Sequence, residues 1–200
     1  MENPVKIALA GEGGQGVQSV AGIMVEAAND SGKEALYIPN FGVEQRGGVS
    51  VAFCQIGDEK IGSPKFKKAD LVIALSDRAV RRTRQYADQN TVYLYDASIK
   101  GVEDGLPQEA KKVMAIPALE IAKKELHPRV FNVIIMGAAI EATKIVGMEQ
   151  AKKAVEKRLG YKFVQNPKLR ELNFKALEEG RGAGSSAGSI DKTPGTHCRK

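Results

Sequence analysis

Four glycines occupy a turn between an apolar segment and an amphipathic one. Residues 11–16 read Gly-Glu-Gly-Gly-Gln-Gly, after the apolar run of residues 5–10 and before the helical pattern of residues 17–29. Glycine lacks a Cβ, so its backbone can adopt positive φ and its N–H can approach a bound group closely. The start of the following helix adds a positive dipole end and unpaired amides. We interpret the turn as a cradle for a phosphate or carboxylate, with tight strand–helix packing as the alternative.

The same turn matches the dinucleotide pattern Gly-x-Gly-x-x-Gly, with its glycines at positions 11, 13 and 16. That class of site also needs an acidic residue at the end of the second strand, where it binds the ribose hydroxyls. The second expected strand ends at Ile38 and is followed by Pro39 and Asn40 instead. The Gly-Lys-Ser/Thr of an ATP-type phosphate loop does not follow the glycines either. The sequence therefore disfavours a dinucleotide-dependent dehydrogenase and a P-loop nucleotidase.

A second glycine-flanked loop follows that strand. Residues 41–48 read Phe-Gly-Val-Glu-Gln-Arg-Gly-Gly. The planar guanidinium of Arg46 suits a carboxylate or a phosphate, and Glu44 is close enough in sequence to orient it. In the alternative interpretation, the loop is only a turn into the next strand and Arg46 is solvated.

Length and composition describe one ordinary domain. The chain has 200 residues, 42% of them hydrophobic and 27% charged. No apolar run reaches the length of a membrane span, and the N-terminal residues lack the basic region of a secretory signal. Two cysteines, Cys54 and Cys198, make no disulfide framework. These features predict a cytoplasmic protein.

The supply of metal ligands is small. A four-iron cluster needs about four thiolates, and this chain has two cysteines and two histidines. The sequence also lacks the Cys/His spacing of a zinc site. We therefore predict no metal ligand in this chain, and any electron transfer must run through another subunit.

The chain is basic, with a formal net charge of +6. Four arginines cluster on one expected helix, at positions 78, 81, 82 and 84. No aromatic platform or nucleic-acid motif accompanies them, so nucleic-acid binding is not predicted. The cluster is instead interpreted as a docking site for an acidic neighbour, as a steering field for an anionic substrate, or as a plain exposed helix face.

The apolar pattern predicts an α/β fold. Strand signals recur at residues 5–10, 35–38, 49–56, 71–75, 91–96 and 113–116. Helical segments separate most of them, notably residues 77–89. This alternation predicts a Rossmann-like three-layer fold with a mostly parallel sheet. The strand at residues 49–56 follows its predecessor too closely for a crossover helix, so we expect it to run antiparallel or to lie at an edge.

The C-terminal part is predicted to be helical. Residues 130–146 are apolar nearly all round, which is typical of a helix deep in a core or against a partner. A more amphipathic helix is expected at residues 149–159, an extended segment at 161–167 and a last short helix at 173–179. We assign residues 1–180 to a single domain and residues 181–200 to a disordered Gly/Ser-rich tail.

The two glycine loops and several later segments together resemble one protein family. The later segments are residues 61–64, 69–75, 132–138 and 173–180. In this order the chain resembles the gamma subunit of the pyruvate and 2-oxoacid:ferredoxin oxidoreductases, nearly to Gly180. Indolepyruvate:ferredoxin oxidoreductase has a homologous subunit, so the resemblance defines the superfamily better than the substrate.

The resemblance implies a place in an enzyme that decarboxylates a 2-oxoacid such as pyruvate, reduces ferredoxin and forms acyl-CoA. It implies alpha and beta subunits with thiamine diphosphate, and a delta-type subunit or domain with iron–sulfur clusters that pass electrons to ferredoxin. Coenzyme A is the co-substrate. The isolated chain is then inactive and holds no catalytic residue, and self-association is left open. Six residues are expected at the subunit junction near coenzyme A: Gly11, Gly13, Gly14, Gln15, Gly16 and Arg46.

A free-standing nucleotide- or coenzyme-A-binding module is the main alternative. It predicts that the purified chain binds such a ligand at micromolar concentration. The subunit interpretation predicts weak binding by the chain alone.

Overall fold

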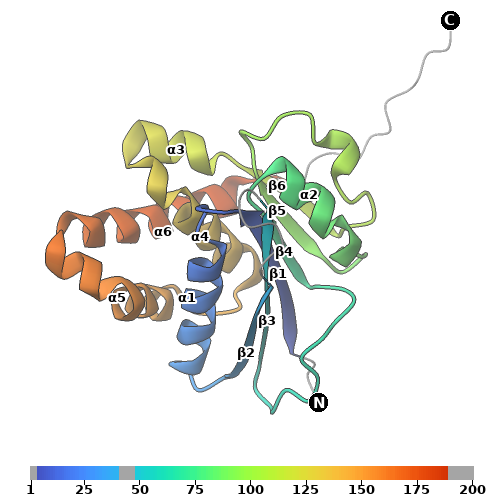
Figure 1. Cartoon of the computed structure of the whole chain (residues 1–200), viewed down its shortest axis with the longest axis horizontal. Helices are drawn as coiled ribbons and strands as arrows, with labels where there is room; N and C mark the ends of the chain where they lie inside the picture. The colour runs from blue at the N-terminus through green and yellow to red at the C-terminus, as the bar shows by residue number, and fades with distance from the viewer. Residues whose placement is uncertain (1–3, 41–47, 189–200) are drawn as a thin grey trace, which may run out of the picture.

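Six strands form one mixed sheet at the centre of the molecule (Figure 1). The computed structural model describes residues 4–40 and 48–188. The strand order is β2-β3-β1-β4-β5-β6. The strands are β1 (Val5–Glu12), β2 (Glu34–Asn40), β3 (Val49–Gly57), β4 (Leu71–Ala74), β5 (Val92–Asp96) and β6 (Lys112–Ile116). Each lies where the apolar pattern predicts a strand.

One strand runs against the others. β3 pairs antiparallel with β1 on one side and with β2 on the other, whereas β1, β4, β5 and β6 pair in parallel. The connection from Asn40 to Val49 is shorter than a parallel crossover requires, which explains the reversal. The antiparallel expectation is confirmed, and the edge position belongs to β2 instead. Pro39 is tolerated there because an edge strand leaves one row of amides unpaired.

Helices cover both faces of the sheet, as predicted (Figure 1). Alternate residues of β1 face opposite cores: Ile7 and Leu9 enter the larger core, and Ala8 and Ala10 the smaller one. The larger core contains residues of α1 (Val17–Asn29), α3 (Ala118–Glu125), α4 (Phe131–Thr143), α5 (Met148–Gln165) and α6 (Lys168–Ser186). The smaller core is closed by α2 (Asp77–Thr83) and the 3-10 turn Arg84–Tyr86. The Rossmann-like three-layer expectation is confirmed.

The apolar helix α4 is a core helix packed against α6. A Cβ built on Gly180 of α6 would lie 2.0 Å from the carbonyl oxygen of Ile134, and one on Gly137 of α4 would lie 2.3 Å from that of Leu177. Gly184 approaches Ala138 in the same way. The two helix backbones therefore touch, which only glycine permits at these positions. This contact joins two of the segments that carry the family resemblance.

The C-terminal helices are longer than expected. The extended segment predicted at residues 161–167 is wrong, because α5 continues to Gln165. The short helix predicted at 173–179 is the middle of α6, which continues through Ser186. The first six residues assigned to the disordered tail are thus helical, since packing against α4 compensates for the weak helix propensity of their glycines. Residues 189–200 lie outside the described residues.

The helix predicted at residues 77–89 is shorter than expected. α2 ends at Thr83, and the 3-10 turn Arg84–Tyr86 follows it. No helix within residues 4–40 and 48–188 is long and apolar enough to cross a membrane.

Candidate functional site

The glycine turn lies at a topological switch point of the sheet. β1 and β4 are parallel neighbours, yet α1 leaves β1 onto one face and α2 leaves β4 onto the other. In open α/β sheets such divergence opens a crevice at the carboxyl ends of the strands, where ligands usually bind. The glycine turn stands at the end of β1. Ser76, which caps α2, stands at the end of β4.

The turn has a packed half and an open half. Gln15 N donates to Glu12 O at 3.1 Å, and Gly14 has a φ of 92°, as the third residue of a type II turn requires. Gly13 and Gly14 are exposed, and a Cβ on either would meet nothing within 4 Å. Gly11 is buried, with Val17 Cγ2 only 2.9 Å from its ideal Cβ position. The two interpretations of the turn thus apply to different glycines. Gly11 serves tight strand–helix packing, whereas Gly13 and Gly14 leave the backbone open, as an anion cradle would need.

Gln15 holds the turn against the neighbouring strand. Its Oε1 accepts from Glu12 N at 2.7 Å, and its Nε2 donates to Leu75 O at 2.9 Å. Both ends of the amide are engaged inside the protein. The structure therefore gives Gln15 a positioning role at the switch point.

Replacing Gln15 with alanine should destabilise the chain by about 1–3 kcal/mol, because two backbone groups lose their partner. The free energy of unfolding, measured in urea, tests this. Gln165→Ala is the matched control, since Gln165 is exposed at the end of α5 and its truncation should change stability by less than about 0.5 kcal/mol. Equal stability of the two variants would contradict the positioning role.

Asn132 reaches the turn from a distant part of the chain. Gly16 caps α1 with a φ of 78°, and a Cβ there would lie 2.1 Å from Nδ2 of Asn132. Asn132 stands in the first turn of α4, directly after the 3-10 turn Pro128–Val130. His127 Nδ1 accepts from Arg129 N at 3.1 Å and so caps that turn. The glycine turn and the α4 segment, both part of the family resemblance, therefore form one site.

A hollow of about 530 Å³ opens beside this contact. The glycine turn, α1, the start of α4, and the ends of α5 and α6 line it. Arg129 and Lys162 contribute cations, Asn173 contributes a buried amide, and none of the described lining residues is acidic. The volume lies within the range of small-molecule sites. The hollow thus combines space, positive charge and backbone amides, which together suit an anionic ligand.

Sequence reasoning found the turn but not the side chains around it. Asn132 could be linked to the site only because it lies in a segment of the family resemblance. Nothing in the sequence pointed to Arg129 or Lys162. Arg46 lies outside the described residues, so its place at the site stays a prediction. Gly11, Gly13, Gly14, Gln15 and Gly16 lie together at the end of β1.

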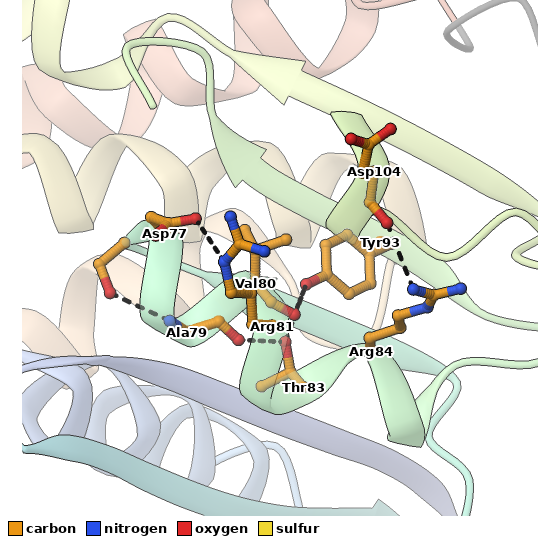
Figure 2. A network of polar contacts seen from close by, with 9 residues as sticks. Asp77, Ala79, Val80, Arg81, Thr83, Arg84, Tyr93 and Asp104 are labelled. Atoms are coloured by element: carbon orange, nitrogen blue, oxygen red, sulfur yellow. Dashed lines mark hydrogen bonds and ion pairs between the residues drawn. The ribbon is translucent and has the colours of Figure 1, made fainter. Parts of the chain in front are cut away.

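Two buried titratable groups lie away from this site. Burial raises the pKa of Cys54 to about 12, so its thiol is no nucleophile at neutral pH. Burial also raises the pKa of Tyr93, whose hydroxyl lies 2.8 Å from Thr83 Oγ1 and fastens α2 to β5 (Figure 2). Both groups are structural. In residues 4–40 and 48–188, no three His, Cys, Asp or Glu side chains gather as metal ligands would.

Comparison with known proteins identifies the family. Residues 6–183 match the family described as pyruvate ferredoxin/flavodoxin oxidoreductase. The chain therefore belongs to that family, as the sequence resemblance predicts.

The named relatives differ in how much of their length this chain spans. The chain is 30% identical over 88% of its length to ketoisovalerate oxidoreductase subunit VorA of Methanothermobacter thermautotrophicus, and spans 35% of that protein. It is 34% identical over 75% of its length to 2-oxoglutarate synthase subunit KorC of Methanocaldococcus jannaschii, and spans 81% of that subunit. This chain thus covers about a third of VorA and most of KorC.

Solved structures share the fold. The gamma subunit of a keto/oxoacid ferredoxin oxidoreductase from Geobacter sulfurreducens is 28% identical, with a TM-score of 0.72 over 92% of this chain and 99% of that one. The 2-oxoglutarate:ferredoxin oxidoreductase from Magnetococcus marinus, solved with 2-oxoglutarate, coenzyme A and succinyl-CoA, has a TM-score of 0.84 at 22% identity. That match covers 96% of this chain and 32% of the other.

Proposed function

We propose that this chain is the gamma-type component of a 2-oxoacid:ferredoxin oxidoreductase and supplies part of the surface that receives coenzyme A. The observation that carries the proposal is the hollow beside the glycine turn, with Arg129 and Lys162 on its wall and no acidic residue among the described ones that line it. Coenzyme A carries a diphosphate and a further phosphate, and such anions favour cations and helix N-termini. Membership of the family and the gamma-type relatives support the same assignment.

The other chemistry of the reaction is assigned to partner chains. Within the described residues there is one thiol, the buried Cys54, and no group of carboxylates and histidines that would hold an ion. That donor set does not fit an iron–sulfur cluster or the metal ion that accompanies thiamine diphosphate. In the proposal, alpha- and beta-type subunits hold thiamine diphosphate and a delta-type subunit holds the clusters. Electrons pass from these clusters to ferredoxin.

The affinity for coenzyme A that this chain can supply by itself is low. An anion gains about 0.3–2 kcal/mol at a helix N-terminus. A hydrogen bond to a charged side chain adds about 1.5–3 kcal/mol. Together these give about 4 kcal/mol, which corresponds to a dissociation constant near 1 mM. The isolated chain should therefore bind coenzyme A weakly, and walls from other subunits should complete the site.

A native pull-down tests the subunit assignment. The tagged chain is isolated anaerobically from its own cells and assayed for coenzyme-A-dependent viologen reduction with a panel of 2-oxoacids. Activity with co-purifying chains that carry thiamine diphosphate and iron–sulfur clusters is expected and would identify the substrate. Isolation of the chain alone, inactive but binding coenzyme A or a nucleotide at micromolar concentration, would favour the free-standing module instead.

The assembled enzyme also tests the hollow. Arg129→Ala and Lys162→Ala should each raise KM for coenzyme A about tenfold with little change in kcat, because each removes one charge from the anion site. Lys153→Ala is the control, since Lys153 is an exposed lysine on the same helix as Lys162 and does not line the hollow. An unchanged KM in both variants would exclude this hollow as the coenzyme A site.

A further inference from the structure

An apolar groove lies on the opposite face of the sheet from the hollow. It has a volume of about 300 Å³ and lies where β2, β3, the following loop and the 3-10 turn Arg84–Tyr86 meet. Three half-buried aromatic rings line it, and the ring of Phe53 contacts the other two. Phe53 meets Phe66 edge-on at 5.5 Å between ring centroids, and Tyr86 edge-on at 5.3 Å. α2 lies on this face near β1 and β4, so the rings over β2 and β3 are not roofed by a helix among the described elements.

The groove is held in shape by hydrogen bonds from two side chains to backbone carbonyls. Gln55 is 3% exposed, and its amide donates to Ser63 O at 2.6 Å, which fastens the loop after β3 to the sheet. Lys68 Nζ donates to Gln85 O at 3.1 Å and to Ala87 O at 2.7 Å, which fastens the end of the same loop to the 3-10 turn. Phe66 and Tyr86 are thereby kept on either side of Phe53. An apolar partner would enter a preformed site, which lowers the ordering cost of binding.

The segments around the groove carry the basic character of the protein. Residues 59–68 and 77–86 contain eight Lys and Arg and two acidic residues, a net charge of +6 that equals the formal net charge of the whole chain. One of the two acids, Asp77, is paired with Arg81 at 3.1 Å. The remaining sequence is neutral in sum, so these two segments account for the formal net charge of the chain.

The arginines of α2 and of the following 3-10 turn have different surroundings. Arg84 donates to Asp104 O at 3.3 Å, on the side of β5 (Figure 2). Arg82 is exposed in the last turn of α2, directly before the 3-10 turn that carries Tyr86. Lys65 lines the groove itself. The groove therefore has Lys65 on its lining and Arg82 on the neighbouring helix.

From this juxtaposition we infer that the groove docks an acidic protein segment that packs one apolar side chain against Phe53, Phe66 and Tyr86. The volume accepts a single side chain, and Lys65 with the basic segments that adjoin the groove matches carboxylates that flank that side chain. Single-stranded nucleic acid fits less well, because the rings pack edge-on against one another and do not offer successive faces for stacking. The inference stands apart from the proposed function, because the groove and the hollow lie on opposite faces.

A peptide titration of the labelled full chain tests the inference. The probe is a short Asp/Glu-rich peptide with one central leucine, and backbone amide shifts are followed by NMR at physiological ionic strength. We expect shift changes confined to the C-terminal end of β2, Phe53, the loop at Lys65 and Phe66, and Tyr86. Replacing the central leucine with serine, or the acidic residues with lysine, should weaken binding at least about tenfold.

Charge-reversed variants test the location. Lys65→Glu with Arg82→Glu should weaken binding of the acidic peptide about tenfold or more, whereas Lys123→Glu with Lys124→Glu should not. The second pair removes the same net charge from exposed positions on α3, so it separates a local effect from a global one. Equal weakening by both pairs, equal affinity of the serine peptide, tighter binding of a single-stranded oligonucleotide, or no shift changes at about 1 mM peptide would each overturn the inference.

Discussion

Gly180→Ala is expected to destabilise the chain by about 3 kcal/mol, at the upper end of the usual cost of overpacking. The new Cβ would lie 2.0 Å from the carbonyl oxygen of Ile134 and 3.0 Å from the Cα of Gly137. Both are backbone atoms, so no side-chain rotation relieves the clash and α6 must move away from α4. Thermal or urea unfolding of the purified variant measures the loss.

The same helix provides a matched control for this prediction. A Cβ on Gly182 would meet nothing within 4 Å, so Gly182→Ala should leave stability unchanged or raise it by about 0.5–1 kcal/mol through helix propensity alone. A stability of Gly180→Ala equal to that of Gly182→Ala would show that α4 and α6 do not pack as closely as described.

Gly16→Ala is expected to destabilise the chain by about 2–3 kcal/mol and to disturb the proposed coenzyme A surface. For alanine, a φ of 78° costs about 1–2 kcal/mol of backbone strain, which lowers the stability of the folded chain. Its Cβ would also displace Asn132, whose Nδ2 lies 2.1 Å from the ideal position. Unfolding free energy in urea measures the first effect. KM for coenzyme A in the assembled enzyme measures the second, and should rise.

A double-variant cycle separates the two causes. Asn132→Ala removes the obstructing amide, so in its presence Gly16→Ala should lose the steric part of its cost and keep the backbone part. Gly13→Ala is the control on the same turn, because a Cβ there meets nothing within 4 Å and should change stability by less than about 0.5 kcal/mol. Full additivity of Gly16→Ala and Asn132→Ala would contradict the contact between the two residues.

Local pattern predicted the sheet and its first helix well. The helical period of residues 17–29 matches α1 (Val17–Asn29), because the buried face of a helix repeats in sequence. The reversal of β3 was also predictable, since a short connection excludes a crossover. Local pattern failed at the C-terminal end. The apolar period of α5 weakens near Gly160 and that of α6 near Gly182. Packing of α5 against α1 and of α6 against α4 supports the helical conformation of both segments.

The candidate site also has features that follow from the sequence and features that only the tertiary structure determines. The amino-acid sequence determined that a glycine turn joins β1 to α1, that the chain lacks the ligands for its own iron–sulfur cluster, and that its net charge is positive. Tertiary structure decided that Gln15 bonds to Leu75 O, that Asn132 lies against Gly16, and that Arg129 and Lys162 share a hollow beside them. It likewise placed three aromatic rings from separate segments in one groove beside Lys65. Sequence periodicity reports which residues are buried within one element, whereas contacts between elements depend on the crossovers and packing angles of the whole chain.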